Sequence, residues 1–113
     1  MTPDSVQIRS RKVGLAWILA QFMEDYDHYA FMDDLRTGET IQEGIARVAE
    51  ETFGYLESGN FEFIIEMLES FDEDDLLPDQ DDARRSILRE LKELRKLDAK
   101  LISKNVLRIK RRR

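Results

Sequence analysis

The sequence predicts an all-α protein, a small bundle of about four helices that ends in a long C-terminal helix. Apolar residues recur at intervals of three and four along most of the 113 residues, as the period of an amphipathic helix requires. Strict alternation of apolar and polar residues is rare, and the chain has no Asn-Gly or Asp-Gly hairpin turn. Charged residues make up 37% of the chain, which fits thin helices with broad polar faces.

The first helix is expected over residues 11–31 and has apolar side chains on two sides. One side holds Leu15, Ile18, Leu19, Phe22, Tyr26 and Tyr29, and the other holds Val13, Trp17, Ala20 and Phe31. A helix that is apolar on two sides is either central to its fold or shared with another chain. Its most apolar stretch, residues 13–23, is too short to span a membrane. We therefore expect no membrane contact and a soluble, cytoplasmic protein.

Two shorter helices are expected in the middle of the chain. Thr40 and Glu43 have the spacing of a capping box, in which each side chain binds the backbone N–H of the other residue. The helix that follows has its apolar stripe on Ile41, Ile45, Val48, Ala49, Phe53 and Leu56. Gly59 suits a left-handed cap at the end of this helix, and Asn60 can cap the next one, at residues 61–71.

A linker and a long last helix complete the expected single domain, which covers residues 1–107. Residues 72–82 carry seven acids and are expected to form a solvated linker inside this domain. The last helix is expected from about residue 80 to residue 107, with an apolar stripe on Ile87, Leu88, Leu91, Leu94, Leu101 and Ile102. Residues 108–113 then form a basic C-terminal tail.

The charges fall into two blocks of opposite sign. Residues 22–82 hold 20 acids and two bases, whereas residues 83–113 hold 13 bases and three acids. The modest net charge of −6 therefore conceals an acidic body and a basic C-terminal helix. Two interpretations stay open. Either the basic helix folds back on the acidic helices and neutralises them, or it is free to bind a polyanion such as a nucleic-acid backbone.

The candidate binding residues lie near the two ends of the chain. Phosphate groups would relieve the repulsion between like charges packed so closely, at an affinity that falls with salt. The candidate nucleic-acid-binding residues are Arg9, Arg11, Lys12, Lys104, Arg108, Lys110, Arg111, Arg112 and Arg113. Val13 and Trp17 are candidate partner-binding residues, because Trp17 lies on the weaker apolar face of the first helix. The alternative for Trp17 is that it packs under the last helix.

The sequence offers little catalytic chemistry. With no cysteine and one histidine, His28, it excludes thiol chemistry and cysteine zinc sites, and nearly excludes a hydrolase triad. Asp25 and His28 have the spacing of half a di-metal carboxylate site, but the chain lacks the second half. The acids from Asp72 onward lack the glycine and glutamate of an EF-hand loop, and no phosphate-binding glycine loop occurs. We therefore expect no enzyme, no metal and no cofactor.

The expected function is that of a non-catalytic helical subunit in a larger assembly such as a nucleoprotein complex. In that role the acidic body contacts other protein subunits, while the basic helix and tail contact nucleic-acid backbone. Small helical subunits of CRISPR effector complexes are of this general size and build, which is an analogy at the level of fold and charge only. The alternative is an acidic adaptor or regulator, antitoxin-like or imitating nucleic acid, that binds a basic protein. Homo-oligomerisation stays open.

Overall fold

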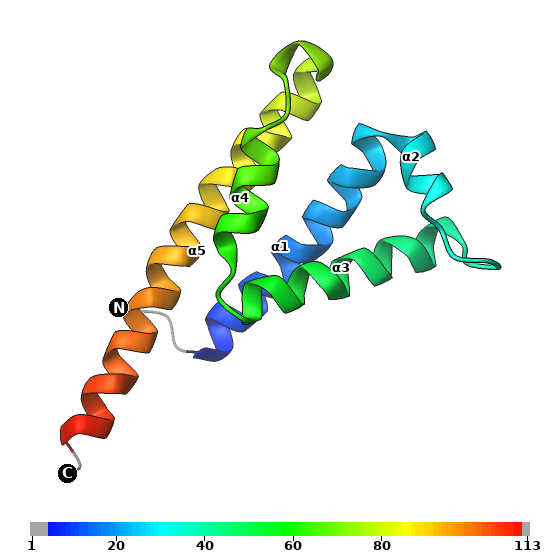
Figure 1. The fold of residues 1–113 in the computed structure, drawn as a ribbon. Coiled ribbons are helices and arrows are strands. Elements are labelled where there is room, and N and C mark those ends of the chain that lie inside the picture. Colours follow the sequence, from blue (N-terminus) through cyan, green and yellow to red (C-terminus); the bar gives the residue numbers. More distant parts are fainter. Residues whose placement is uncertain (1–4, 112–113) are drawn as a thin grey trace.

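The computed structural model describes the backbone of residues 5–111 and the side chains of residues 5–101. Its elements are α1 (Ser5–Tyr26), α2 (His28–Asp33), α3 (Ile41–Glu57), α4 (Phe61–Glu69), the 3-10 turn η1 (Glu73–Asp75) and α5 (Pro78–Arg111). No strand occurs among the described residues, so the predicted all-α class is confirmed. The bundle ends in its longest helix, as predicted, although α2 is an additional short helix (Figure 1).

The first helix, α1, lies at the centre of the bundle. It contacts α3 on one side and α5 on another, while α4 packs mainly against α5. Figure 1 shows α4 lying along α5, and α3 returning from α2 toward the start of α4. Consequently α1 has two covered sides and a third side that no other described helix covers.

The apolar side chains gather in two clusters that α1 joins. The larger cluster packs α1 against α4 and α5, and its most completely buried large side chains are Ile8, Leu56, Phe61, Leu68, Leu91 and Leu94. The smaller cluster lies where α1, α2 and α3 meet, and it consists of Ala20, Phe31, Ile45 and Ala49. The predicted stripes of α3 and α5 contribute to these clusters through Ile45, Ala49, Leu56, Ile87, Leu91 and Leu94.

The predicted single helix over residues 11–31 is wrong, because the chain breaks at Asp27. The helix begins at Ser5 and ends at Tyr26, and the Asp27 side chain then accepts a hydrogen bond from Ala30 N at 3.0 Å, which caps α2. The new helix turns Phe31 into the smaller cluster and leaves Tyr29 81% exposed. Ile18 is 53% exposed as well, so neither residue lies on the buried face that the helical period predicted.

The caps around α3 follow the sequence in part. The capping box is confirmed, since Thr40 Oγ1 accepts from Glu43 N at 3.1 Å and the Glu43 carboxylate accepts from Thr40 N at 3.4 Å. Gly59 has a φ of +81°, which confirms the left-handed cap. Asn60 makes no side-chain cap, so that prediction is wrong. Its backbone N–H instead donates to the carbonyl of Tyr55 at 2.9 Å and closes the turn after α3.

The acidic connection before α5 is shorter than the predicted linker of residues 72–82. Pro78 occupies the first position of α5, where its missing N–H costs nothing, so residues 78–82 belong to the helix. Gln80 is buried, and its side chain accepts from Leu77 N at 3.0 Å and donates to the carbonyl of Asp25 at 3.2 Å. These two bonds tie the start of α5 to the end of α1, which a solvated linker would not do.

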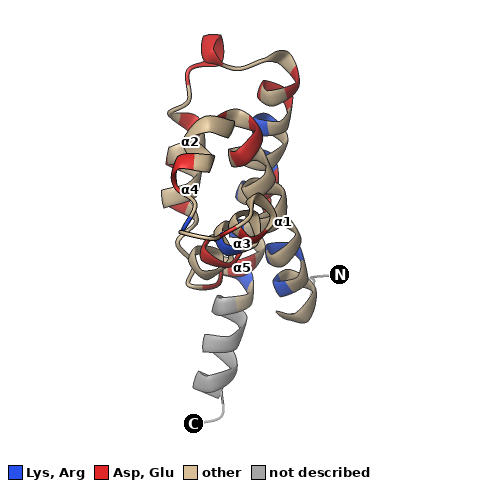
Figure 2. Ribbon diagram, turned by 90° about the vertical axis from the view of Figure 1, so that its right-hand side faces the viewer, with Lys and Arg blue, Asp and Glu red and all other residues tan. Residues whose placement is uncertain are grey.

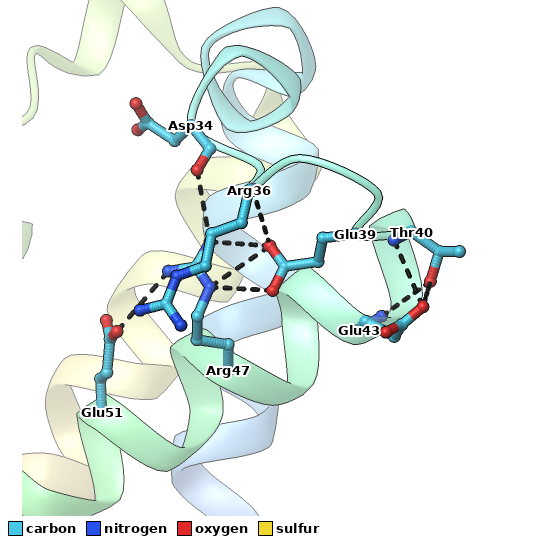
Figure 3. Close-up of polar contacts among 7 residues, drawn as sticks. All are labelled: Asp34, Arg36, Glu39, Thr40, Glu43, Arg47 and Glu51. Atoms are coloured by element: carbon cyan, nitrogen blue, oxygen red, sulfur yellow. Dashed lines mark hydrogen bonds and ion pairs between the residues drawn. The ribbon is translucent and has the colours of Figure 1, made fainter.

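A network of polar contacts centred on Glu39 holds the loop between α2 and α3 (Figure 3). Its carboxylate accepts from Arg47 Nε and Nη2, each at 3.1 Å, and from the backbone N–H of Arg36 at 3.2 Å. Arg47 also lies 3.5 Å from Glu51. The hydrogen bonds from Arg47, above all, hold the pKa of Glu39 below its ordinary value.

Glu39 should therefore make stability depend on acid pH. A carboxyl whose pKa is lower in the folded chain stabilises the fold above its unfolded pKa, and this contribution disappears as the pH falls through the folded pKa. The Glu39→Gln variant should accordingly lose stability relative to the wild type at neutral pH, and the two proteins should converge as the pH falls below the lowered pKa of Glu39. Urea unfolding at a series of pH values measures this difference. A difference that grows toward low pH would contradict the assignment.

Candidate nucleic-acid interface

The basic side chains of α5 divide into an inner set and an outer set. The inner set pairs with acids on α4 and on the connection to α5, whose charges are coloured in Figure 2. Lys92 Nζ lies 3.2 Å from Glu69, and Arg95 forms an ion pair with Glu62. Nearer the start of the helix, the bases Arg84 and Arg85 share the carboxylate of Asp81, at 2.9 and 3.1 Å. The pairs of Lys92 and Arg95 with α4 support the interpretation that α5 folds back on an acidic helix, whereas the two pairs with Asp81 lie within α5 itself.

Arg84 is part of the fold rather than of a binding surface. Its side chain is 8% exposed, and Nη1 donates to the carbonyl of Leu68 at 3.2 Å, near the end of α4. That carbonyl belongs to the last turn, where backbone acceptors lack partners within the helix. Arg84 Nε is buried and has no hydrogen-bond partner among the described residues. The guanidinium is therefore enclosed by the protein and is not available to a ligand.

The three acids of the basic C-terminal block are all bound by bases of α1. Arg11 lies 3.0 Å from Glu90 and 3.5 Å from Glu93, and the hydrogen bond to Glu90 raises the pKa of the Arg11 guanidinium above its ordinary value. Lys12 Nζ lies 3.0 Å from Asp98. Helix α5 therefore forms ion pairs with two neighbours: its bases pair with acids of α4, and its acids pair with bases of α1.

The outer set consists of Arg89, Lys96 and Lys100. All three are exposed, and none has an ion pair among the described residues. Their spacings of seven and four residues place them on one side of α5, opposite the buried stripe, along about 16 Å of helix. The acid on the same row, Glu93, is occupied by Arg11. A positive strip without neutralising partners therefore runs along the outer side of α5.

The sequence-predicted bases of α1 do not form a common free surface. Lys12 is buried, with its ammonium held by Asp98 and 3.9 Å from Glu57. Arg11 is engaged by α5, and Arg9 is exposed with its guanidinium 5.6 Å from the centre of the Phe53 ring. The other candidates, whose side chains lie outside the described residues, are Lys104, Arg108, Lys110, Arg111, Arg112 and Arg113.

Sequence reasoning missed Arg89, Lys96 and Lys100, although a signal for them exists. Each lies opposite the apolar stripe of Ile87, Leu91 and Leu94 when the residues are placed on an ideal helix. That placement predicts exposure, but it cannot tell which exposed bases find acids on a neighbouring helix. On the same helix, Lys92 is exposed and Arg95 is half-buried, and both are paired with acids of α4.

The two predicted partner-binding residues lie together on the surface. Val13 and Trp17 are 41% and 43% exposed. They line a shallow groove of about 320 Å³ between α1 and α3, whose other lining residues are Ala16, Ala46, Ala49, Glu50 and Phe53. Packing of Trp17 under the last helix is therefore wrong, because the indole lies beside α3.

Other kinds of site find no support in the described part of the chain. Residues 5–101 contain no group of three or more His, Cys, Asp or Glu side chains arranged to hold a metal ion, and His28 contacts Glu24. None of the described helices is both long and apolar enough to cross a membrane. No protein-family model matches the sequence, and no curated protein or solved structure is significantly similar to the chain.

Proposed function

We propose that the protein is a non-catalytic helical subunit of a nucleoprotein assembly, in which the outer side of α5 contacts the phosphate backbone. The observation that carries the proposal is the free row of Arg89, Lys96 and Lys100 on a helix whose inner bases are paired with acids. In the sequence the same spacing continues at Lys104 and Arg111, so one helical row holds five bases.

Electrostatics favours a polyanion on this row. Like charges four residues apart on a helix, such as Lys96 and Lys100, destabilise it by a few tenths of a kcal/mol. Phosphates relieve this repulsion, and counterions released from the nucleic acid add a driving force that falls with salt. The row reads no base sequence by itself, because lysine and arginine contacts to phosphate position a protein without specifying sequence. Binding should therefore be weakly dependent on sequence.

Neutralising the outer row should remove most of the binding. In the triple variant R89Q/K96Q/K100Q, the dependence of log K on log salt for a fluorescently labelled single strand should become shallower by about 2, from three lost phosphate contacts. Fluorescence anisotropy at several salt concentrations measures this slope. Circular dichroism should show unchanged helix content, because the three side chains are exposed and unpaired in the described structure.

A matched variant distinguishes the effect of the outer row from the effect of net charge alone. R85Q/K92Q/R95Q removes the same charge from the same helix, but from bases that are engaged by Asp81, Glu69 and Glu62. Its salt slope should stay within about one unit of the wild-type slope. Equal losses in the two variants would show a net-charge effect and refute the proposed row. If the wild-type chain does not bind nucleic acid at low salt but binds a basic protein, the result would favour the alternative function of an acidic adaptor.

A further inference from the structure

Between Val6 and Gln21, the side of α1 that faces solvent carries no charged side chain, and the exposed Asp25 is the first charge on that side, in the last turn of the helix. Helix α1 is covered by α3 and α5, and the exposed positions along its remaining side are Val6, Ser10, Val13, Gly14, Trp17, Ile18 and Gln21. We call this set the open face of α1. Its four large apolar side chains are between 41% and 74% exposed. In a chain with 37% charged residues, an uncharged face this long needs a physical explanation.

Gly14 lies within the open face, and no contact within the chain requires a glycine at this position. Its φ is not positive, and a Cβ added there would meet nothing within 4 Å. Glycine in a helix interior is less favourable than alanine, so neither backbone geometry nor internal packing accounts for it. A small residue at the middle of an apolar helix face does allow another helix to approach closely.

We propose that the open face of α1 is the interface of a two-fold homodimer, in which the α1 helices of two copies pack antiparallel near Trp17. Charge at the ends of the face selects a second copy as the occupant. Arg9 near the start of α1 and Glu24 near its end lie on the same flank of the face, and each is seven or eight residues from Trp17. A two-fold axis beside Trp17 therefore brings Arg9 of each copy next to Glu24 of the other.

The remaining features of α1 agree with the antiparallel arrangement. On the opposite flank the same axis brings Asp25 of one copy within about one helical turn of Arg11 of the other, whose guanidinium also binds Glu90 of its own α5. The two helix dipoles also run in opposite directions. At the axis the two Trp17 side chains meet, and Gly14, one turn away, leaves room for the ring of the second copy. The groove beside Trp17 accepts an apolar side chain from that copy.

The dimer is tested first by its mass. Sedimentation equilibrium of the full chain should give a concentration-dependent mass that approaches twice the 13.3 kDa of one chain. The Trp17→Glu variant should remain at the monomer mass, because it brings two like carboxylates together at the two-fold axis among apolar side chains. The matched variant Phe63→Glu also replaces a half-exposed aromatic, 51% exposed on α4, and should dimerise like the wild type. Circular dichroism confirms that each variant keeps its helix content.

A charge exchange tests the antiparallel geometry. Arg9→Glu and Glu24→Arg each place like charges together twice in the dimer, and each should raise the dimer Kd about tenfold. The double variant R9E/E24R restores opposite charges and should return the Kd close to the wild-type value. A chain that stays monomeric at its highest soluble concentration would overturn the proposal, as would a dimer that Trp17→Glu leaves intact. Failure of the double variant to restore the Kd would overturn the antiparallel arrangement. None of these outcomes depends on nucleic-acid binding.

Discussion

Replacing Phe61 with alanine should lower the free energy of unfolding by about 3–5 kcal/mol. Phe61 is the first residue of α4 and is 2% exposed in the larger apolar cluster. Removing its ring leaves a cavity among α1, α4 and α5, and it also removes the aromatic surface 5.9 Å from the Lys12 ammonium. Denaturation in urea, followed by circular dichroism, measures the loss as a lower midpoint at an unchanged slope.

Phe63 is the matched control for this substitution, two residues further along the same helix. It is 51% exposed and stacks on Tyr55, with ring centres 4.9 Å apart. Phe63→Ala should therefore cost only about 0.5–1.5 kcal/mol, the contribution of an aromatic pair. Equal losses at Phe61 and Phe63 would mean that α4 does not present the face described above to the core.

The ion pair between Lys12 and Asp98 should give the second large effect. The two side chains are 6% and 13% exposed, and Nζ lies 3.0 Å from Oδ1. Removing one partner leaves a charge with little access to water, so Lys12→Met and Asp98→Leu should each cost about 3 kcal/mol. Replacing both by apolar residues removes the stranded charge, and the double variant should recover most of the loss.

This pair of residues forms a double-mutant cycle that unfolding in urea can complete. A coupling of about 2 kcal/mol or more between the two substitutions is expected for partners in direct contact. Simple addition of the two single losses would contradict the contact. The Glu57 carboxylate lies 3.9 Å from Lys12, so we expect it to replace Asp98 in part as a partner for Lys12 in the Asp98→Leu variant. Asp98→Leu should consequently be the milder of the two single substitutions.

The parts of the fold that the sequence predicted well depend on local signals. The capping box at Thr40 and the left-handed Gly59 are determined by residues within one turn, so their spacing suffices to locate the ends of α3. The long C-terminal helix was equally visible, because its apolar stripe persists over several turns. The break at Asp27 was missed, since apolar residues continue beyond it and the aspartate competes as a cap.

Long-range contacts account for what local pattern could not predict. Lys12 was expected on the surface, yet it is buried because Asp98 lies 86 residues away in the sequence and beside it in space. Gly44 is similar, since a Cβ at that position would lie 2.3 Å from Leu35 Cδ2. The candidate interface shows the same division. Helical period places Arg89, Lys96 and Lys100 on an outer side, but only the fold shows that their neighbours on α5 have acidic partners.

The polar contacts of α5 also fix its position along its own axis. An apolar stripe repeats almost every turn, so a long helix could slide by about 5.4 Å and still bury leucine against leucine. Such a slide would separate Lys12 from Asp98, Arg11 from Glu90 and Arg84 from the Leu68 carbonyl at the same time. These contacts therefore select one axial position of α5 relative to α1 and α4. The outer bases of α5 and the open face of α1 are therefore held at constant heights relative to each other, so a partner that spans both meets a surface of fixed geometry.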